Sequence, residues 1–66
     1  MANGIAKFVQ EVTVVDPDSG LEVEVCLYKD MSTGGIFGID SSFIASEEPE
    51  TVKSPFADVV LTLVGD

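Results

Sequence analysis

The sequence predicts a small α+β fold in which an antiparallel-rich sheet carries one short helix on one face. Eighteen of the 66 residues are the β-branched Val, Ile or Thr, against only four Leu, and this bias favours strands over helices. Two segments of alternating apolar and polar residues flank a cluster of turn formers at 16–20. A chain this short holds a single domain, residues 1–66, that buries only about 60% of its unfolded surface.

The first element is a β-hairpin between Lys7 and Lys29. A slip of one residue would turn an entire apolar set to the other face, so the register that aligns the apolar faces is favoured. It places Val14 opposite Leu21 and leaves residues 16–19 as the loop. It also places Glu11 opposite Glu24 on the outer face. The expected core-facing side chains are Phe8, Val12, Val14, Leu21, Val23, Val25 and Leu27.

The second half of the chain predicts a third strand, a helix and a last strand. Residues 36–39 form a short strand weakened by Gly38. Residues 40–42 offer N-cap side chains for a helix of about two turns that ends before Pro49. Residues 49–55 form a connecting loop and residues 58–64 a final strand. The side chains expected to face the core from these last elements are Phe43, Ile44, Val59, Leu61 and Leu63.

Charge narrows the range of partners. The chain has twelve acidic residues but only three lysines and no Arg or His, and its formal net charge is −9. Such a field repels nucleic acid and anionic membranes, so we expect no direct contact with either. A hydrophobic content of 45% predicts a folded rather than a disordered chain. Cys26 is the sole cysteine and no segment has the length of a secretory signal or membrane span, so we expect a cytoplasmic location.

No residue constellation for catalysis is apparent. The chain has no His, the usual acid–base group at neutral pH. Cys26 lies on a predicted strand without a cation to activate it, so it is interpreted as a bystander thiol. Asp16 and Asp18 alternate with other polar residues as in the first half of a calcium loop, but strands rather than helices flank them. We therefore expect no enzyme activity, no catalytic residues, no cofactor and no bound metal.

The function predicted is a small non-enzymatic protein-interaction module of unknown process. Apolar side chains off the main apolar face, such as Val9 and Val60, suggest a sheet edge or exposed face that binds a protein. The expected partner is a second copy, forming a homodimer, or a basic protein. The alternative is a nucleic-acid mimic whose carboxylate stripe enters the basic groove of a DNA- or RNA-binding protein. The candidate interaction residues are Glu11, Asp16, Asp18, Glu22 and Glu24.

Overall fold

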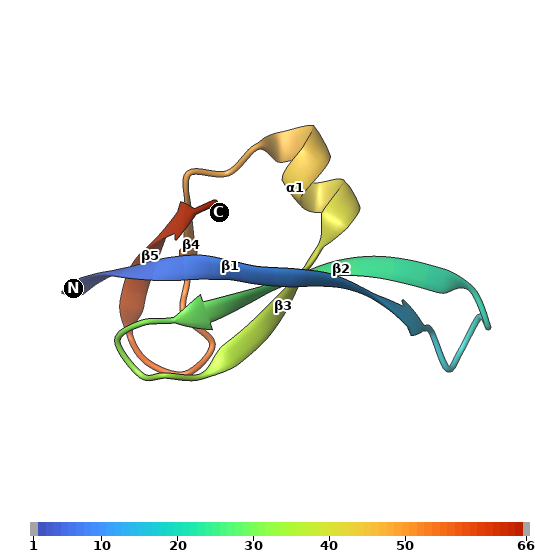
Figure 1. The fold of residues 1–66 in the computed structure, drawn as a ribbon, viewed down its shortest axis with the longest axis horizontal. Helices are drawn as coiled ribbons and strands as arrows, with labels where there is room; N and C mark the ends of the chain where they lie inside the picture. The colour runs from blue at the N-terminus through green and yellow to red at the C-terminus, as the bar shows by residue number, and fades with distance from the viewer. Residues whose placement is uncertain (1, 66) are drawn as a thin grey trace.

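The computed structural model describes residues 2–65, which form a small mixed sheet of five strands with one short helix (Figure 1). The elements are β1 (Ala2–Val15), β2 (Glu22–Asp30), β3 (Ile36–Asp40), α1 (Ser41–Glu47), β4 (Thr51–Lys53) and β5 (Val59–Val64). The strand order across the sheet is β3-β2-β1-β5-β4. Among these residues, no helix is long and apolar enough to cross a membrane.

The predicted α+β class is confirmed in outline, but the antiparallel-rich detail is only partly right. β1 pairs with β5 in parallel, whereas the remaining pairings are antiparallel. The parallel pairing arises because β1 is longer than the hairpin requires. Its first half, Ala2–Lys7, offers an edge to Val59–Val64. In addition, β4 lies inside the segment that was predicted to be a loop.

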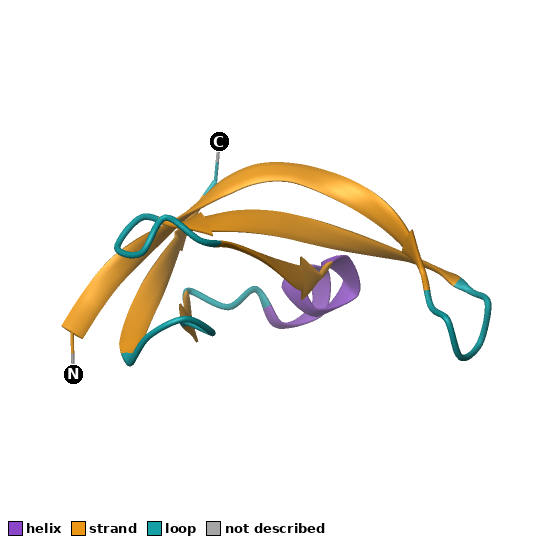
Figure 2. Cartoon of the chain, turned by 90° about the horizontal axis from the view of Figure 1, so that it is seen from below, coloured by secondary structure: helices purple, strands orange, loops and turns teal. Residues whose placement is uncertain are grey.

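The sheet curls into an arch with the helix on its concave side (Figure 2). The molecule is elongated, with extents of 37 × 21 × 19 Å, because the β1–β2 hairpin projects beyond the other strands (Figure 1). α1 packs against β2 and β3. Its N-cap is Asp40, the first of the three candidates at 40–42, and the Asp40 carboxylate accepts a hydrogen bond from the Ser42 amide at 2.9 Å. The helix ends at Glu47, and Glu48 is its C-cap, directly before Pro49.

The predicted hairpin is present, but its predicted register is wrong by two residues. Val14 lies opposite Val23 rather than Leu21, and a bulge interrupts β1 between Phe8 and Gln10. The turn causes the difference. Gly20 adopts a φ of 75°, and the strands first meet where the Asp16 amide donates to the Leu21 carbonyl at 2.8 Å. The four-residue loop is therefore 17–20 rather than 16–19, and this shift by one residue moves the register by two.

The assignment of the core face in the hairpin is also wrong. The buried apolar side chains are Ala6, Cys26, Tyr28 and Leu61. The expected core residues Val12, Val14, Val23, Val25 and Leu27 lie outside this cluster, on the opposite, convex side. The bulge is one cause, because it puts Phe8 and Val12 on different faces. The expectation for β5 is confirmed, since Leu61 is fully buried and Val59 and Leu63 pack beside it.

Aromatic rings explain why the concave side became the core. The Phe8 ring meets the Tyr28 ring edge to face at a centroid distance of 5.7 Å. Phe37 stacks on Tyr28 at 6.3 Å, and Phe56 meets Phe37 at 6.2 Å. Rings bury more area than valines do, so a face that gathers four of them from separate segments prevails over a face of valines.

Candidate functional site

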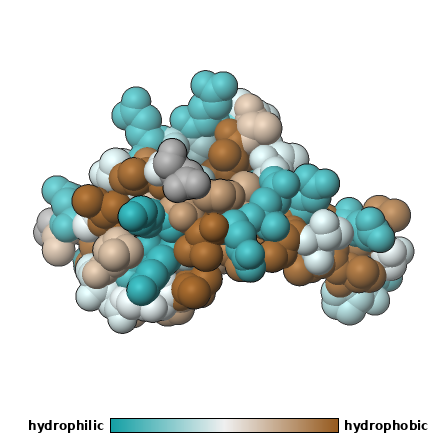
Figure 3. Space-filling view, viewed as in Figure 1, coloured by the Kyte–Doolittle hydropathy of each residue, from teal (hydrophilic) through white to brown (hydrophobic). Residues whose placement is uncertain are grey.

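The convex side of the sheet carries an apolar surface that no element among residues 2–65 covers. Alternation along the paired strands puts every second side chain of each strand on this side. We call this surface the convex patch. Its members are Ile5, Val12, Val14, Val23, Val25, Leu27, Ile36, Val60 and Val64. Ile36 is 55% exposed and Val14 45%, while Val12, Val25 and Leu27 are half-buried. Figure 3 shows apolar side chains at the surface along the whole length of the molecule, with hydrophilic side chains between them.

The convex patch extends from β1 across β2 to β3, with the polar residues Gln10, Lys7 and Lys29 among its apolar side chains. Gly38 of β3 lies opposite Leu27, and a Cβ at Gly38 would come within 2.5 Å of the Val25 Cγ1 atom. The side chains of Val25 and Leu27 therefore lean over the backbone of Gly38, which only a residue without a side chain allows. The valine rows of the hairpin and Ile36 thus belong to one surface.

All three lysines of the chain lie on this same side. Lys7 is directly opposite Lys29, and Lys53 is opposite Val60. Like charges directly across a strand pair are destabilising. Of the acidic strand residues, Asp40 shares this side through its pairing with Val25, and its carboxylate is engaged in capping α1. The convex side is therefore apolar and locally cationic in a chain of net charge −9.

One edge of β1 is open beyond Lys7. β5 pairs with β1 only as far as Lys7, while β2 occupies the other edge of β1 up to Val15. No strand among the described residues pairs with this edge from 8 to 15. Within that stretch Glu11 is the one charged residue, and there is no Lys or Pro, the residues with which proteins commonly block edge pairing. Figure 1 shows the stretch running out along the projecting hairpin.

The free backbone groups of this edge can be assigned. In an antiparallel pair, residues alternate between pointing their N–H and C=O at the partner strand and away from it. The Asp16 amide donates to Leu21, so Asp16 points inward toward β2. By alternation, Glu11, Thr13 and Val15 point their N–H and C=O groups outward.

The predicted interaction residues fall into two groups. Glu22 and Glu24 share the concave side with Glu11, but Glu11 lies opposite Cys26 rather than Glu24. The Glu11 carboxylate accepts hydrogen bonds from the Ser41 hydroxyl at 2.9 Å and the Cys26 thiol at 3.8 Å. Asp16 and Asp18 lie in the hairpin turn, where the Asp16 carboxylate accepts the Asp18 amide at 2.9 Å.

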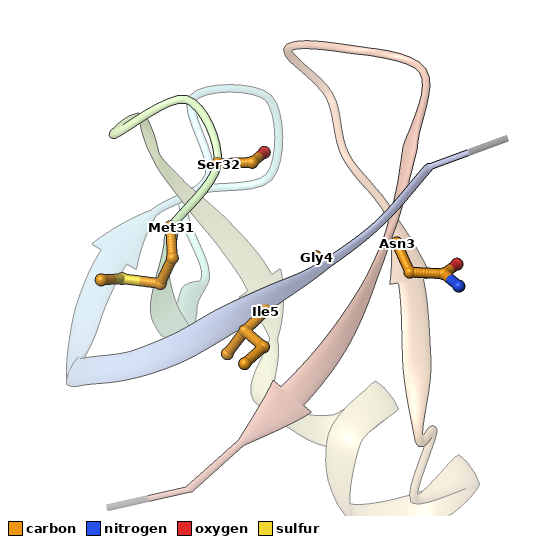
Figure 4. A pocket seen from close by; sticks show the side chains of 5 residues that line it. All are labelled: Asn3, Gly4, Ile5, Met31 and Ser32. Atoms are coloured by element: carbon orange, nitrogen blue, oxygen red, sulfur yellow. The ribbon is translucent and has the colours of Figure 1, made fainter.

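An open hollow of about 450 Å³ lies between the hairpin and the start of α1. Its lining includes Glu22, Glu24 and Asp40, together with Ser41 and Ser42. Despite these carboxylates, no three Asp, Glu or Cys side chains within residues 2–65 lie close enough together to hold a metal ion. A second hollow, of about 410 Å³, lies beside the first residues of β1 (Figure 4). Its lining residues are Asn3, Gly4, Ile5, Met31 and Ser32.

A buried carboxylate that the sequence analysis missed connects two loops. Asp30 is 0% exposed, and its Oδ1 atom accepts the Ser32 amide at 2.8 Å and the Ser32 hydroxyl at 2.6 Å. Its Oδ2 atom accepts the Ser54 hydroxyl at 2.6 Å. The hydrogen bonds from Ser32 and Ser54 hold the pKa of Asp30 well below its usual range. The spacing of Asp30 and Ser32 is a local turn signal, but nothing local points to Ser54.

The nucleophile candidates are enclosed by the fold. Cys26 is 8% exposed, and its thiol points at the Glu11 carboxylate rather than at a cation. Burial, with a smaller effect of nearby Cys26, raises the pKa of Tyr28. Neither side chain lines either of the two hollows.

Comparison with known proteins gives no match to any family model, curated protein or solved structure.

Proposed function

We propose that this chain is a non-enzymatic protein-interaction module that binds its partner through the convex patch. The observation that supports the proposal is the uncovered apolar face itself. Large exposed apolar patches rimmed by polar residues mark interaction sites on soluble proteins. Here the apolar side chains belong to a regular sheet, so their positions are set by backbone pairing and the surface is largely pre-formed. Binding to such a surface requires little ordering of the module.

The partner that suits this surface is a protein with an apolar centre and acidic groups at its rim. Lys7 and Lys29 lie side by side on the convex side, and a partner carboxylate between them would relieve their mutual repulsion. Burial of apolar area provides most of the affinity in this proposal, and the lysines provide orientation. The proposal places the module in the cytoplasm, where its single cysteine, Cys26, would stay reduced.

The acidic side offers less support for the alternative, the nucleic-acid mimic. A mimic needs a free row of carboxylates. Glu11, in the middle of the predicted stripe, is engaged by Ser41 and Cys26. Glu22 and Glu24 beside α1 and the two aspartates of the turn are the members that remain available to a basic groove.

Two neighbouring valines on opposite faces test the proposal. Val14 belongs to the convex patch, whereas Val15 is 62% exposed and points to the other side of β1. Val14→Lys should weaken partner binding, as should Ile36→Lys at the far side of the patch. Val15→Lys adds the same charge one residue away and should leave binding intact.

The measurement is quantitative capture of partners from the native cell lysate by the immobilised wild-type chain and each variant, with circular dichroism to verify folding. A partner lost with Val14→Lys and Ile36→Lys but retained with Val15→Lys supports the convex patch. Equal capture by all variants, or capture that is lost only in moderate salt and depends on Glu22 and Glu24, would contradict it and favour the mimic.

A further inference from the structure

We propose that a second copy of this chain pairs with the open edge of β1, antiparallel and with Thr13 on the two-fold axis, so that two sheets join into one. The inference deepens the proposed function by naming self-association as one interaction of the module, and it uses the strand edge rather than the convex patch. Strand addition at an open edge gives affinity through backbone hydrogen bonds.

The backbone supports this register. Glu11, Thr13 and Val15 point their N–H and C=O groups away from β2, as derived above from the Asp16–Leu21 hydrogen bond. With Thr13 on the axis, Thr13 pairs with Thr13 of the second copy. Glu11 then pairs with Val15 of the second copy, and the reverse. Every outward group of the three residues thereby gains a hydrogen-bond partner.

The side chains are compatible with the same register. On the convex side Val12 of each copy comes opposite Val14 of the other, so the convex patch continues across the junction. On the concave side Thr13 meets Thr13, a favourable cross-strand pair. The pairing shifted so that Glu11 would face Glu11 is disfavoured by like charge. The side chains of this edge therefore favour the register with Thr13 on the axis over the register with Glu11 on the axis.

Charge complementarity also favours a second copy. In the antiparallel arrangement the hairpin turn of one copy lies alongside β1 of the other, with its Asp16 opposite Gln10 and its Asp18 past the bulge, close to Lys7. Lys7 lies at this end of the open edge of β1, directly opposite Lys29 of β2. The acidic turn of each copy therefore approaches the lysine pair of the other. The two copies otherwise repel each other through their net charge of −9, so this local attraction selects the orientation.

The rest of the fold leaves room for this arrangement. β5 occupies the same edge of β1, but only up to Lys7. The added strand pairs with residues 11–15, and its own β5 lies beyond the hairpin turn of the first copy. The two arches extend in opposite directions from the junction. The closed two-fold pairing uses the open edge of both copies, so it ends at a dimer.

Sedimentation equilibrium on the full chain, over a hundredfold concentration range reaching several hundred micromolar, tests the inference. Wild type should show a monomer–dimer equilibrium. Thr13→Lys places two ammonium groups against each other at the axis, and it leaves the β1–β2 hydrogen bonds intact because Thr13 points outward. It should weaken dimerisation at least about tenfold. Thr13→Val keeps strand propensity without adding charge and should dimerise like wild type.

A charge pair of variants tests the orientation. Asp18→Lys in the turn should weaken the dimer by bringing like charges near Lys7. Glu47→Lys in α1 makes the same change in net charge away from the junction. This variant should dimerise at least as tightly as wild type. Equal weakening by both variants, or by neither, would overturn the proposed register.

The outcomes separate this inference from the proposed function. If the chain is a strict monomer over the whole concentration range, the edge pairing is overturned. The proposed function is then still tested separately, by the effect of Ile36→Lys on partner capture. Self-association that Ile36→Lys abolishes and Thr13→Lys spares would show contact through the convex patch instead, and would equally overturn the inference. Should Thr13→Lys fail to fold, hydrogen exchange on wild type decides: the amides of Glu11, Thr13 and Val15 must gain protection as concentration rises.

Discussion

Replacing Asp30 with asparagine removes a charge that is buried in the core while preserving the size of the side chain. The wild-type carboxylate accepts hydroxyl hydrogen bonds from Ser32 and Ser54, both at 2.6 Å, and amide hydrogen bonds from Ser32 and Thr33. In Asp30→Asn the amide oxygen keeps the contacts near Ser32. The new NH₂ group faces the Ser54 hydroxyl, which already accepts the Phe56 amide at 3.1 Å, so the Ser54 proton loses its acceptor.

The expected cost follows from those contacts. Hydrogen bonds to charged groups are worth about 1.5–3 kcal/mol each, and a buried donor left unpaired costs about 1–3 kcal/mol. We expect Asp30→Asn to lower the free energy of unfolding by about 2–4 kcal/mol. A domain of this size has only about 3–5 kcal/mol from a single core, so the variant should be close to unfolding at 25 °C. Loss of the link between Asp30 and Ser54 should also loosen the β4–β5 loop.

Urea denaturation followed by circular dichroism measures the effect. The midpoint should fall, while the slope should change little if the denatured state is the same. Asp58→Asn is the matched control, because Asp58 is exposed and makes only a surface ion pair with Lys53 at 3.6 Å, for which a change of less than about 1 kcal/mol is expected. A change below about 0.5 kcal/mol for Asp30→Asn would refute the structural role assigned to the buried carboxylate.

Three further results are expected. The pKa of Asp30 is lowered in the folded state by its hydroxyl partners, so the stabilisation that the carboxylate provides is fully present above the unfolded carboxyl pKa of about 3.9 and is lost as pH falls. The difference in unfolding free energy between wild type and Asp30→Asn should therefore be constant above about pH 5 and shrink below about pH 4. A constant difference down to about pH 2 would contradict this assignment. Gly35→Ala should destabilise by about 1–3 kcal/mol in the same urea assay, because the added Cβ would come within 2.6 Å of the Phe56 ring, and an unchanged midpoint would show that the ring moves freely. Raising salt from low to moderate concentration should raise the melting temperature in a thermal scan because it screens the repulsion among the acidic residues; no rise would mean that they are already dispersed or paired.

Local patterns in the sequence were sufficient for several elements. The turn formers at 16–20 between two alternating segments predicted the hairpin. The N-cap candidates at 40–42 predicted the start of α1 and Pro49 its end, and the alternation of Val59, Leu61 and Leu63 predicted β5. Each of these depends on residues close together in the chain, where backbone conformation and side-chain period are decided locally. They establish which elements exist.

The sharing of one side by Glu11, Glu22 and Glu24 was likewise predictable from strand alternation. The contacts that these carboxylates make were not predictable from the sequence. Glu11 contacts Cys26 because the loop starts one residue later than predicted, which shifts the register by two, and it meets Ser41 because α1 lies on the concave side. The open edge of β1 was equally hidden, since it depends on where β5 stops pairing.

The sequence by itself thus determined the strand-rich composition, the hairpin, the helix and the last strand. Tertiary structure alone decided which face of the hairpin is buried. Both faces carry apolar side chains, so alternation could not choose between Val12 and Val25 on one side and Cys26 and Tyr28 on the other. The choice depends on aromatic rings that Phe37 and other distant residues bring to the concave side, and on the bulge after Phe8. The valines were left facing outward because contacts between distant segments bury more area than the hairpin can bury alone.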